Sequence, residues 1–154
     1  MKEKIKVSSS QFNYQYGNQI HFPYSIARLV SFLRTNEKFV DKLDFAKTCI
    51  FRNRFDESVN DCIDSDVLLC SCYVWNWEIT TKFAMEVKKR NPNCLVIFGG
   101  PQVPDNSEGF FEKHTFVDII VHGEGEYIVN DIFEEFITSK NFENVKGIET
   151  KEFR

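Results

Sequence analysis

The sequence predicts an α/β fold in which a five-stranded parallel sheet carries helices on both faces. Strand-like segments alternate with helical segments along the whole chain. Two strand candidates, over 67–73 and 94–98, are almost continuously apolar, as expected of parallel strands covered on both faces. The 154 residues suit one compact domain with a substantial core. For a doubly wound unit of this length, we expect the flavodoxin-like (Rossmann-like) strand order 2-1-3-4-5.

The first part of the chain contains two strand candidates and two helix candidates. A short strand is predicted over 5–10. Pro23 is a favourable first residue for the next helix, because its fixed φ suits that position. Apolar residues recur in this helix at spacings of three and four, at Ile26, Leu29, Val30 and Leu33. A second strand is predicted over 45–51, interrupted at Lys47, and a short helix over 57–63.

The middle of the chain continues the alternation with stronger signals. The apolar strand over 67–73 precedes a helix over 78–90, whose apolar residues are spaced by four at Ile79, Phe83 and Val87. An Asn-Pro-Asn turn at 91–93 ends this helix, and the apolar strand over 94–98 follows it.

The last part of the chain predicts one more strand between two helices. A short helix is expected over 109–113 and a strand over 117–121. The final helix, over 126–137, places Ile128, Ile132 and Phe136 on one stripe. The tail over 145–153 is either a further strand or a linker.

Composition and charge exclude several classes of protein. The net charge is −4 with dispersed acidic residues, which argues against a nucleic-acid binder because such proteins usually carry a basic stripe. No apolar run approaches the roughly 20 residues that a membrane-spanning helix needs. The N-terminal residues 1–6 lack the apolar core of a signal peptide. Five cysteines without framework spacing suit a reducing compartment. We therefore expect a cytoplasmic protein that binds neither nucleic acid nor membranes.

The unusual residues collect at one edge of the predicted sheet. A polar-aromatic loop over 11–22 follows the first strand, and an aromatic segment over 73–77 follows the third. Glycine-containing loops over 99–104 and 122–126 follow the fourth and fifth. In open parallel sheets, ligands bind outside the carboxyl ends of the strands. The sequence therefore predicts a ligand site at this edge.

Each of these loops also has a purely structural interpretation. The glycine pair at 99–100 also suits a tight turn after a buried strand. The segment 123–126 also suits a helix entry, where acidic residues are favourable near the positive end of the helix dipole. Trp75 and Trp77 are large enough that burial against neighbouring helices is the usual outcome. The shared location of the loops, rather than any one of them, favours a site.

Motifs for self-sufficient catalysis are missing from the sequence. There is no GK[ST] phosphate loop, no G-x-G-x-x-G after the first strand and no G-x-S-x-G elbow. Cys70 and Cys72 alternate on one strand face, but no second Cys or His pair completes a zinc site. Glu124 and Glu126 diverge on a helix, which disfavours paired acid–base work. We assign no catalytic residue and no metal ligand.

Three motifs follow one another in the second half of the chain. Residues 71–76 fit the pattern S-x-Y-x-W-N, residues 99–103 fit GGP-x-V, and residues 121–126 fit V-x-G-E-G-E. An N-P-x turn lies between the first two motifs. With these motifs, residues 67–136 resemble the N-terminal cobalamin (vitamin B12)-binding domain of cobalamin-dependent radical S-adenosylmethionine (SAM) enzymes. The first sixty residues resemble the family only loosely.

The resemblance implies cobalamin as the cofactor and a set of binding residues. Tyr73 and Trp75 would line the face of the corrin ring, and Asn76 and Gln102 would bind its peripheral amides. A further implication is that the backbone of the glycine pair at 99–100 approaches the nucleotide tail. The implied cofactor-binding residues are Tyr14, Gln19, Ser71, Tyr73, Val74, Trp75, Asn76, Gly99, Gly100, Pro101, Gln102, Val103, Gly123, Glu124, Gly125 and Glu126.

The resemblance also implies base-off cobalamin without histidine ligation of cobalt. Methionine synthase and the mutases place a D-x-H-x-x-G motif after the first strand, and its histidine binds cobalt. Here His21 is followed by Phe-Pro-Tyr instead. The lower face of the ring would then be open, water-bound or approached by Tyr14, Tyr16 or Gln19. His21 stays open as an unconventional ligand.

The family's radical-generating barrel, with its cysteine triplet, is not in this sequence. We therefore expect residues 1–140 to form a cobalamin-binding domain and 141–154 to begin a linker or extra strand toward a downstream domain. The domain would present the corrinoid to a radical SAM domain in cis or trans for methyl transfer or related chemistry, as an excised module or a free-standing carrier. Two alternatives remain: a degenerate interaction or regulatory domain that binds no corrinoid, and a flavin- or nucleotide-binding enzyme.

Overall fold

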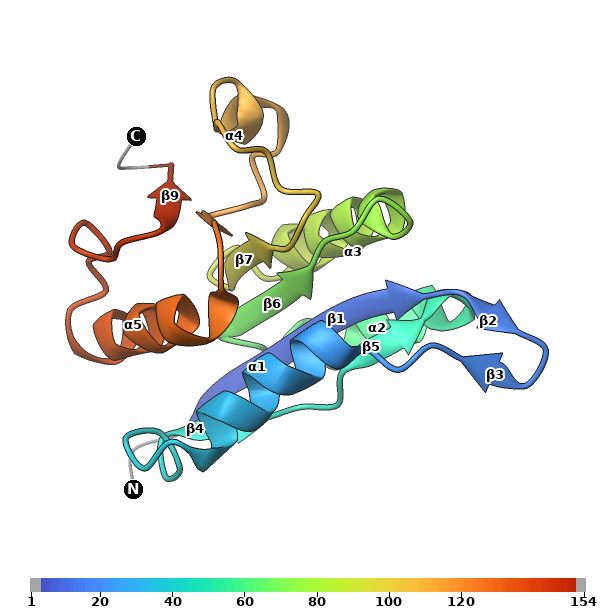
Figure 1. Ribbon diagram of the computed structural model, residues 1–154, viewed down its shortest axis with the longest axis horizontal. Coiled ribbons are helices and arrows are strands. Elements are labelled where there is room, and N and C mark those ends of the chain that lie inside the picture. Colours follow the sequence, from blue (N-terminus) through green and yellow to red (C-terminus); the bar gives the residue numbers. More distant parts are fainter. Residues whose placement is uncertain (1–3, 152–154) are drawn as a thin grey trace.

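The protein is an α/β domain with a mostly parallel central sheet, as predicted (Figure 1). The computed structural model describes residues 4–151. Its main sheet has seven strands, six of them in the order β4 (Leu43–Phe45), β1 (Ile5–Asn13), β6 (Val67–Ser71), β7 (Leu95–Gly99), β8 (Ile119–Val121) and β9 (Ile148–Thr150). The seventh, β5 (Cys49–Phe51), also pairs with β1. The expectation of five strands in the order 2-1-3-4-5 is therefore not confirmed.

The expected second strand is divided into β4 and β5. Both pair in parallel with β1, β4 through Val7↔Phe45 and β5 through Ser10↔Cys49. Between these pairs the register slips by one residue, which is the signature of a bulge on an edge strand. The hydroxyl groups of Ser9 and Thr48 lie 2.9 Å apart beside the slip. The polar stretch around residue 47 is thus a break in the strand.

The first strand is longer than predicted, because residues 11–13 continue it. All three are buried, and the ring of Phe12 packs edge-on against Phe83 with centroids 5.1 Å apart. The predicted loop over 11–22 therefore starts later. It contains a small hairpin, β2 (Gln15–Tyr16) and β3 (Gln19–Ile20), which extends beyond the end of β1 in Figure 1. Gly17, with φ +58°, makes the turn.

Helices cover both faces of the sheet. Side chains alternate along β6, so Val67 and Leu69 pack into one core cluster while Leu68 and Cys70 pack into another. The first cluster includes α1 (Tyr24–Thr35) and α5 (Gly125–Thr138), and the second includes α2 (Phe55–Cys62) and α3 (Trp77–Arg90). Each fully buried aliphatic or aromatic side chain contributes about 1.5–3 kcal/mol to folding.

The helix predictions agree with the structure within a few residues. The remaining helices are α4 (Phe110–Lys113) and the short 3-10 helix η1 (Arg52–Arg54). The tail contains β9, which pairs antiparallel with β8 through Val121↔Ile148. The strand alternative for the tail is therefore correct over 148–150. The division at residue 140 stays a prediction, and the parts of the expectations that fall on 1–3 and 152–154 lie outside the described residues.

Within residues 4–151, no helix combines the length and the apolar character that a membrane span requires.

Candidate functional site

The loops singled out from the sequence meet at the carboxyl ends of the parallel strands. The chain leaves β1 toward β4 on one side, whereas β6 lies on the other side, so the winding direction changes between β1 and β6. Such a switch point opens a crevice outside the strand ends. Two cavities lie at this edge, which we call the inner cavity and the outer cavity.

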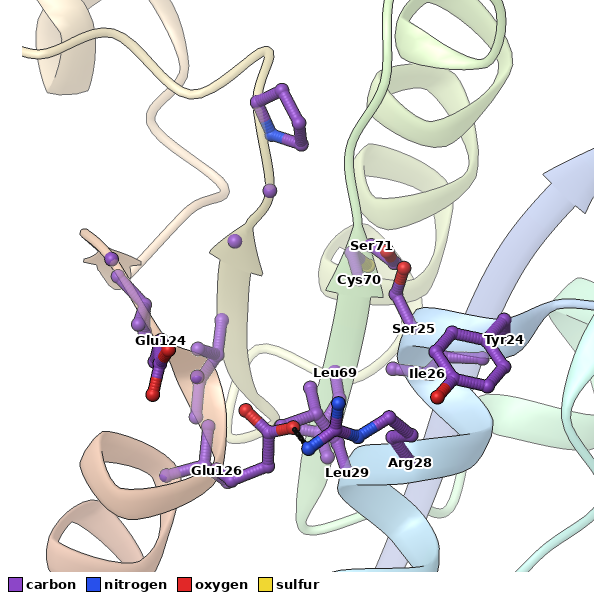
Figure 2. Close-up of a pocket in the computed structure, with 18 of the residues that line it drawn as sticks. Tyr24, Ser25, Ile26, Arg28, Leu29, Leu69, Cys70, Ser71, Glu124 and Glu126 are labelled. Atoms are coloured by element: carbon purple, nitrogen blue, oxygen red, sulfur yellow. Dashed lines mark ion pairs between the residues drawn. The ribbon is translucent and has the colours of Figure 1, made fainter.

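The inner cavity lies between α1, the start of α5 and the ends of β6, β7 and β8 (Figure 2). Its volume is about 300 Å³. Leu69, Ile97 and Val121 give it an apolar floor, and all three belong to the core cluster on the α1–α5 face. Ser71, on the same face of β6 as Leu69, adds a buried hydroxyl, and Ser25 adds another from α1.

The outer cavity lies beyond the end of β1, beside the β2–β3 hairpin, and has a volume of about 450 Å³. Its lining includes Tyr16, Phe22 and Trp75, which are 65%, 71% and 44% exposed. Tyr14 and His21 also line it. Several large rings left in water at one place are typical of a binding surface rather than of a core.

A stacked pair of rings separates the two cavities. The rings of Tyr73 and Trp75 lie 4.3 Å apart between centroids and only 13° from parallel. Tyr73 lines the inner cavity and Trp75 the outer one. The hydroxyl of Tyr73 is hydrogen-bonded to that of Ser25, which ties this wall to α1.

Trp75 is held by the first strand through its indole and by η1 through its backbone carbonyl. Its Nε1 donates to Oδ1 of Asn13 at 3.3 Å, and Nδ2 of Asn13 donates to the carbonyl of His21 at 2.9 Å. The guanidinium of Arg52 donates to the carbonyl of Trp75 and lies 4.0 Å from the ring centroid of Tyr14. The hydrogen bond and the cation–π contact of Arg52 together connect the segments after β1, β5 and β6.

Asn76 holds the aromatic loop in shape. Its side chain is fully buried, its Oδ1 accepts from the backbone N–H of Tyr73 at 2.8 Å, and its Nδ2 donates to the carbonyl of Ser71 at 3.0 Å. Both ends of the amide are therefore occupied within the loop. We therefore expect Asn76 to position Tyr73, whereas the resemblance implied that it binds a corrin amide.

Replacing Asn76 with alanine is expected to lower the free energy of unfolding by about 1–3 kcal/mol, because two buried backbone groups lose their partners. Urea denaturation measures this change. The exposed Asn93, replaced in the same way, should shift stability by less than about 0.5 kcal/mol. An Asn76→Ala protein of unchanged stability that loses ligand binding would show instead that Asn76 contacts the ligand.

The two glycines of the GGP motif have different surroundings. A Cβ on Gly99 would meet only the Cβ of Val121, at 3.6 Å, which is an ordinary contact. Gly100 has φ +108°, and a Cβ there would lie 2.6 Å from the carbonyl oxygen of Cys72. Gly99 therefore leaves space in the inner cavity, whereas Gly100 allows two backbone segments to approach each other.

Charge at the inner cavity comes from α1 and from the start of α5. Nη2 of Arg28 lies 2.8 Å from Oε1 of Glu126, and Glu124 lies nearby on the loop before the helix (Figure 2).

Cys70, which also lines the inner cavity, carries no charge there. Burial raises the pKa of Cys70, at the end of β6, to about 12. Its thiol is therefore protonated at neutral pH and is not available as a thiolate.

Most of the residues predicted from the sequence lie at the inner cavity. They come from three segments, namely Ser71 and Tyr73 at the end of β6, residues 99–101 at the end of β7 and residues 123–126 after β8. Tyr14 and Trp75 line the outer cavity. Neither cavity is lined by the other predicted residues, Gln19, Val74, Asn76, Gln102 and Val103.

Sequence reasoning missed the contribution of α1. Tyr24, Ser25 and Arg28 line the inner cavity, and Arg52 supports the outer one. The Phe-Pro-Tyr helix start was the one available signal, because it places the first turn of α1 at the same edge as the loops. In the part of the chain that the structure describes, no group of three or more His, Cys, Asp or Glu side chains could hold a metal ion.

Fold and site together define an α/β domain with two cavities at the carboxyl edge of a mostly parallel sheet. No protein-family model matches the chain. It is 38% identical over 110 residues to the cobalamin-dependent radical SAM methyltransferase TokK of Streptomyces tokunonensis. It is also 38% identical over 109 residues to the 2-(S-pantetheinyl)-carbapenam-3-carboxylate methyltransferase of Streptantibioticus cattleyicolor.

These matches cover 71% and 70% of this chain but only 16% of each relative. The matched part of the chain thus spans about one sixth of the length of each of these methyltransferases. The resemblance to cobalamin-dependent radical SAM enzymes, which the three motifs indicated, is confirmed.

Proposed function

We propose that this domain binds cobalamin, base-off and without histidine ligation, at the carboxyl edge of its sheet. It then presents the corrinoid to a radical SAM domain, in cis or in trans, for methyl transfer or related chemistry. The observation that carries this proposal is the pair of cavities on either side of the Tyr73–Trp75 wall. Homology to a cobalamin-dependent methyltransferase supports it.

The inner cavity fits the nucleotide tail of cobalamin. Its volume of about 300 Å³ is at the lower end of the range for ligand pockets, so it suits the tail rather than the whole cofactor. The apolar floor matches the flat benzimidazole, and the buried hydroxyl of Ser71 matches the polar ribose. The space beside Gly99 is one that a side chain would fill. A tail held here is away from cobalt, which is the base-off arrangement.

The outer cavity and the wall fit the corrin ring. A corrin is broad, flat and methyl-rich, so exposed rings such as Trp75 and Phe22 offer it apolar contact. Gln102 and Val74 are exposed beside the wall and can meet the amide-bearing periphery. When bound, cobalamin would supply the carrier for the methyl group, while the residues of the two cavities hold it in place.

His21 stays an alternative ligand for cobalt. Its ring lines the outer cavity and packs edge-on against Tyr16, with centroids 5.8 Å apart. In the base-off form without histidine ligation, His21→Ala should leave the absorption spectrum of the bound corrinoid unchanged. A spectral shift on this substitution would assign His21 to cobalt.

A titration with hydroxocobalamin tests the proposed function directly. After desalting, the protein should retain about one equivalent of corrinoid, and its absorption spectrum should be that of the base-off form. Loss of the corrinoid from a folded sample would contradict the proposal. The exposed rings of the outer cavity would then favour the alternative, an interaction domain that binds no corrinoid.

The ring-binding role of Trp75 is tested by its replacement with alanine. We expect the affinity for hydroxocobalamin to fall about tenfold, because a large contact area is lost. Trp77 provides the control, since it packs against Phe98 on the other face of the sheet and lines neither cavity. Trp77→Phe should keep the affinity within about twofold. Equal losses in both variants would show that the Trp75 effect is a general effect on folding.

A further inference from the structure

An ion pair joins the two sides of the inner cavity. Arg28 reaches from the second turn of α1 to Glu126 in the first turn of α5, with Nη2 and Oε1 2.8 Å apart (Figure 2). The Arg28 side chain is 59% exposed, whereas that of Glu126 is only 18% exposed. The guanidinium therefore lies at the solvent side of the cavity and is anchored by a carboxylate that is largely covered.

The Arg28–Glu126 ion pair is not the sole contact between α1 and α5 in the part of the chain that the structure describes. Leu29 of α1 already packs against Gly125 of α5, where a Cβ would lie 3.2 Å from Leu29 Cδ2. A second ion pair, Lys38 with Glu134, links the chain after α1 to α5 and lines neither cavity. Because the Arg28 side chain is 59% exposed, solvent weakens its ion pair with Glu126, which therefore contributes little to stability. The position of Arg28 at the cavity therefore suggests a role toward a ligand.

Arg28 is the one cationic side chain that lines the inner cavity among the described residues. Two carboxylates, Glu124 and Glu126, line the same cavity and would repel an anion in the absence of Arg28. The ion pair uses one terminal nitrogen, Nη2. A guanidinium has five N–H donors, so donors remain for a second acceptor while Glu126 fixes the group in place.

We propose that Arg28 binds the phosphodiester of the nucleotide tail and thereby makes this domain selective for corrinoids that carry the nucleotide. This inference rests on the proposed function, because it concerns the same cavity. The phosphodiester is the anionic group of the tail, and arginine pairs with phosphate through two parallel hydrogen bonds. A corrinoid that lacks the nucleotide has no phosphate to offer Arg28, so this charge-assisted contact is lost.

The test compares two probes, hydroxocobalamin and cobinamide, which keeps the corrin ring but lacks the phosphate, ribose and base. Arg28→Gln should weaken the binding of hydroxocobalamin about tenfold, as expected for a lost charge-assisted contact. It should leave the binding of cobinamide within about twofold, since the ring contacts are unchanged. Lys38→Gln, which removes the ion pair between the chain after α1 and Glu134 of α5, should change neither affinity.

The salt dependence of binding provides a second measurement. It would not change in the Arg28 variant if the role of Arg28 were purely structural. In the unchanged protein, added KCl should weaken the binding of hydroxocobalamin more than that of cobinamide, and Arg28→Gln should remove this difference. Urea denaturation of Arg28→Gln checks that the variant is folded.

The outcomes separate the two proposals. An unchanged protein that binds neither probe overturns the proposed function and this inference together. A protein that binds both probes, but in which Arg28→Gln affects both equally or neither, overturns the role of Arg28 and leaves cobalamin binding standing.

Discussion

Replacing Gly99 with leucine is expected to abolish the retention of cobalamin while the protein stays folded. Gly99 and Ile97 lie on the same face of β7, and Ile97 forms part of the floor of the inner cavity. The new Cβ would have only Val121 Cβ within 4 Å, at 3.6 Å, and φ at this position lies outside the left-handed region. The leucine side chain therefore enters the cavity and occupies the space proposed for the nucleotide tail.

The expected loss of affinity for hydroxocobalamin is at least about 100-fold, or about 2.7 kcal/mol, because tail and side chain cannot share one volume. Equilibrium titration followed by absorbance measures it. Gly99→Ala is the graded control, since a single methyl group takes much less of the cavity. The free energy of unfolding of both variants should stay within about 1 kcal/mol of the parent. Normal affinity in Gly99→Leu would mean that the tail does not occupy the inner cavity.

For Gly100 the opposite result is expected, namely a loss of stability caused by substitution within the fold itself. Gly100→Ala is expected to lower the free energy of unfolding by about 2–4 kcal/mol, because backbone strain and a steric clash add together. The strain comes from φ +108°, and the clash comes from the Cys72 carbonyl oxygen, which would lie 2.6 Å from the new Cβ. Urea denaturation of the ligand-free protein measures the change without reference to any cofactor.

Substitution of Gly123 is a control that distinguishes backbone strain from steric clash in Gly100→Ala. It also has a positive φ, +84°, but no atom lies within 4 Å of the position of its Cβ. Gly123→Ala therefore introduces strain alone and should cost about 1 kcal/mol of stability, less than Gly100→Ala. If Gly100→Ala were as stable as the parent, the close approach of residues 72 and 100 would be wrong.

Neighbouring residues of one motif have different surroundings in the structure, and these differences lead to the opposite expectations for Gly99 and Gly100. The resemblance assigned Gly99 and Gly100 the same role, an approach of backbone to the nucleotide tail. In the structure one glycine leaves space and the other lets its own chain pass the Cys72 backbone. Likewise, Trp75 lies exposed at the outer cavity, whereas Asn76 beside it is buried and shapes the loop. Each of these motifs thus combines a residue at a cavity with a neighbouring residue that shapes the backbone.

Local periodicity was enough to predict the α/β class and most of the helices. The apolar run over 67–71 indicates a strand covered on both faces, and Leu68 and Leu69 do face opposite core clusters. Spacings of three and four in α1 and α5 predict one apolar stripe each, because a helix places such residues on one side. The edge of the sheet that carries the site followed from the same pattern, since the loops after parallel strands share one edge.

Other features were decided only by the tertiary structure, because they depend on contacts between distant parts of the chain. The division of the edge strand into β4 and β5 and the antiparallel pairing of β9 follow from packing against β1 and β8. Arg28 meets Glu126 only because α1 and α5 pack on the same face of the sheet. Periodicity states which side of an element is buried, but the partner across a cavity is set by how the elements pack together.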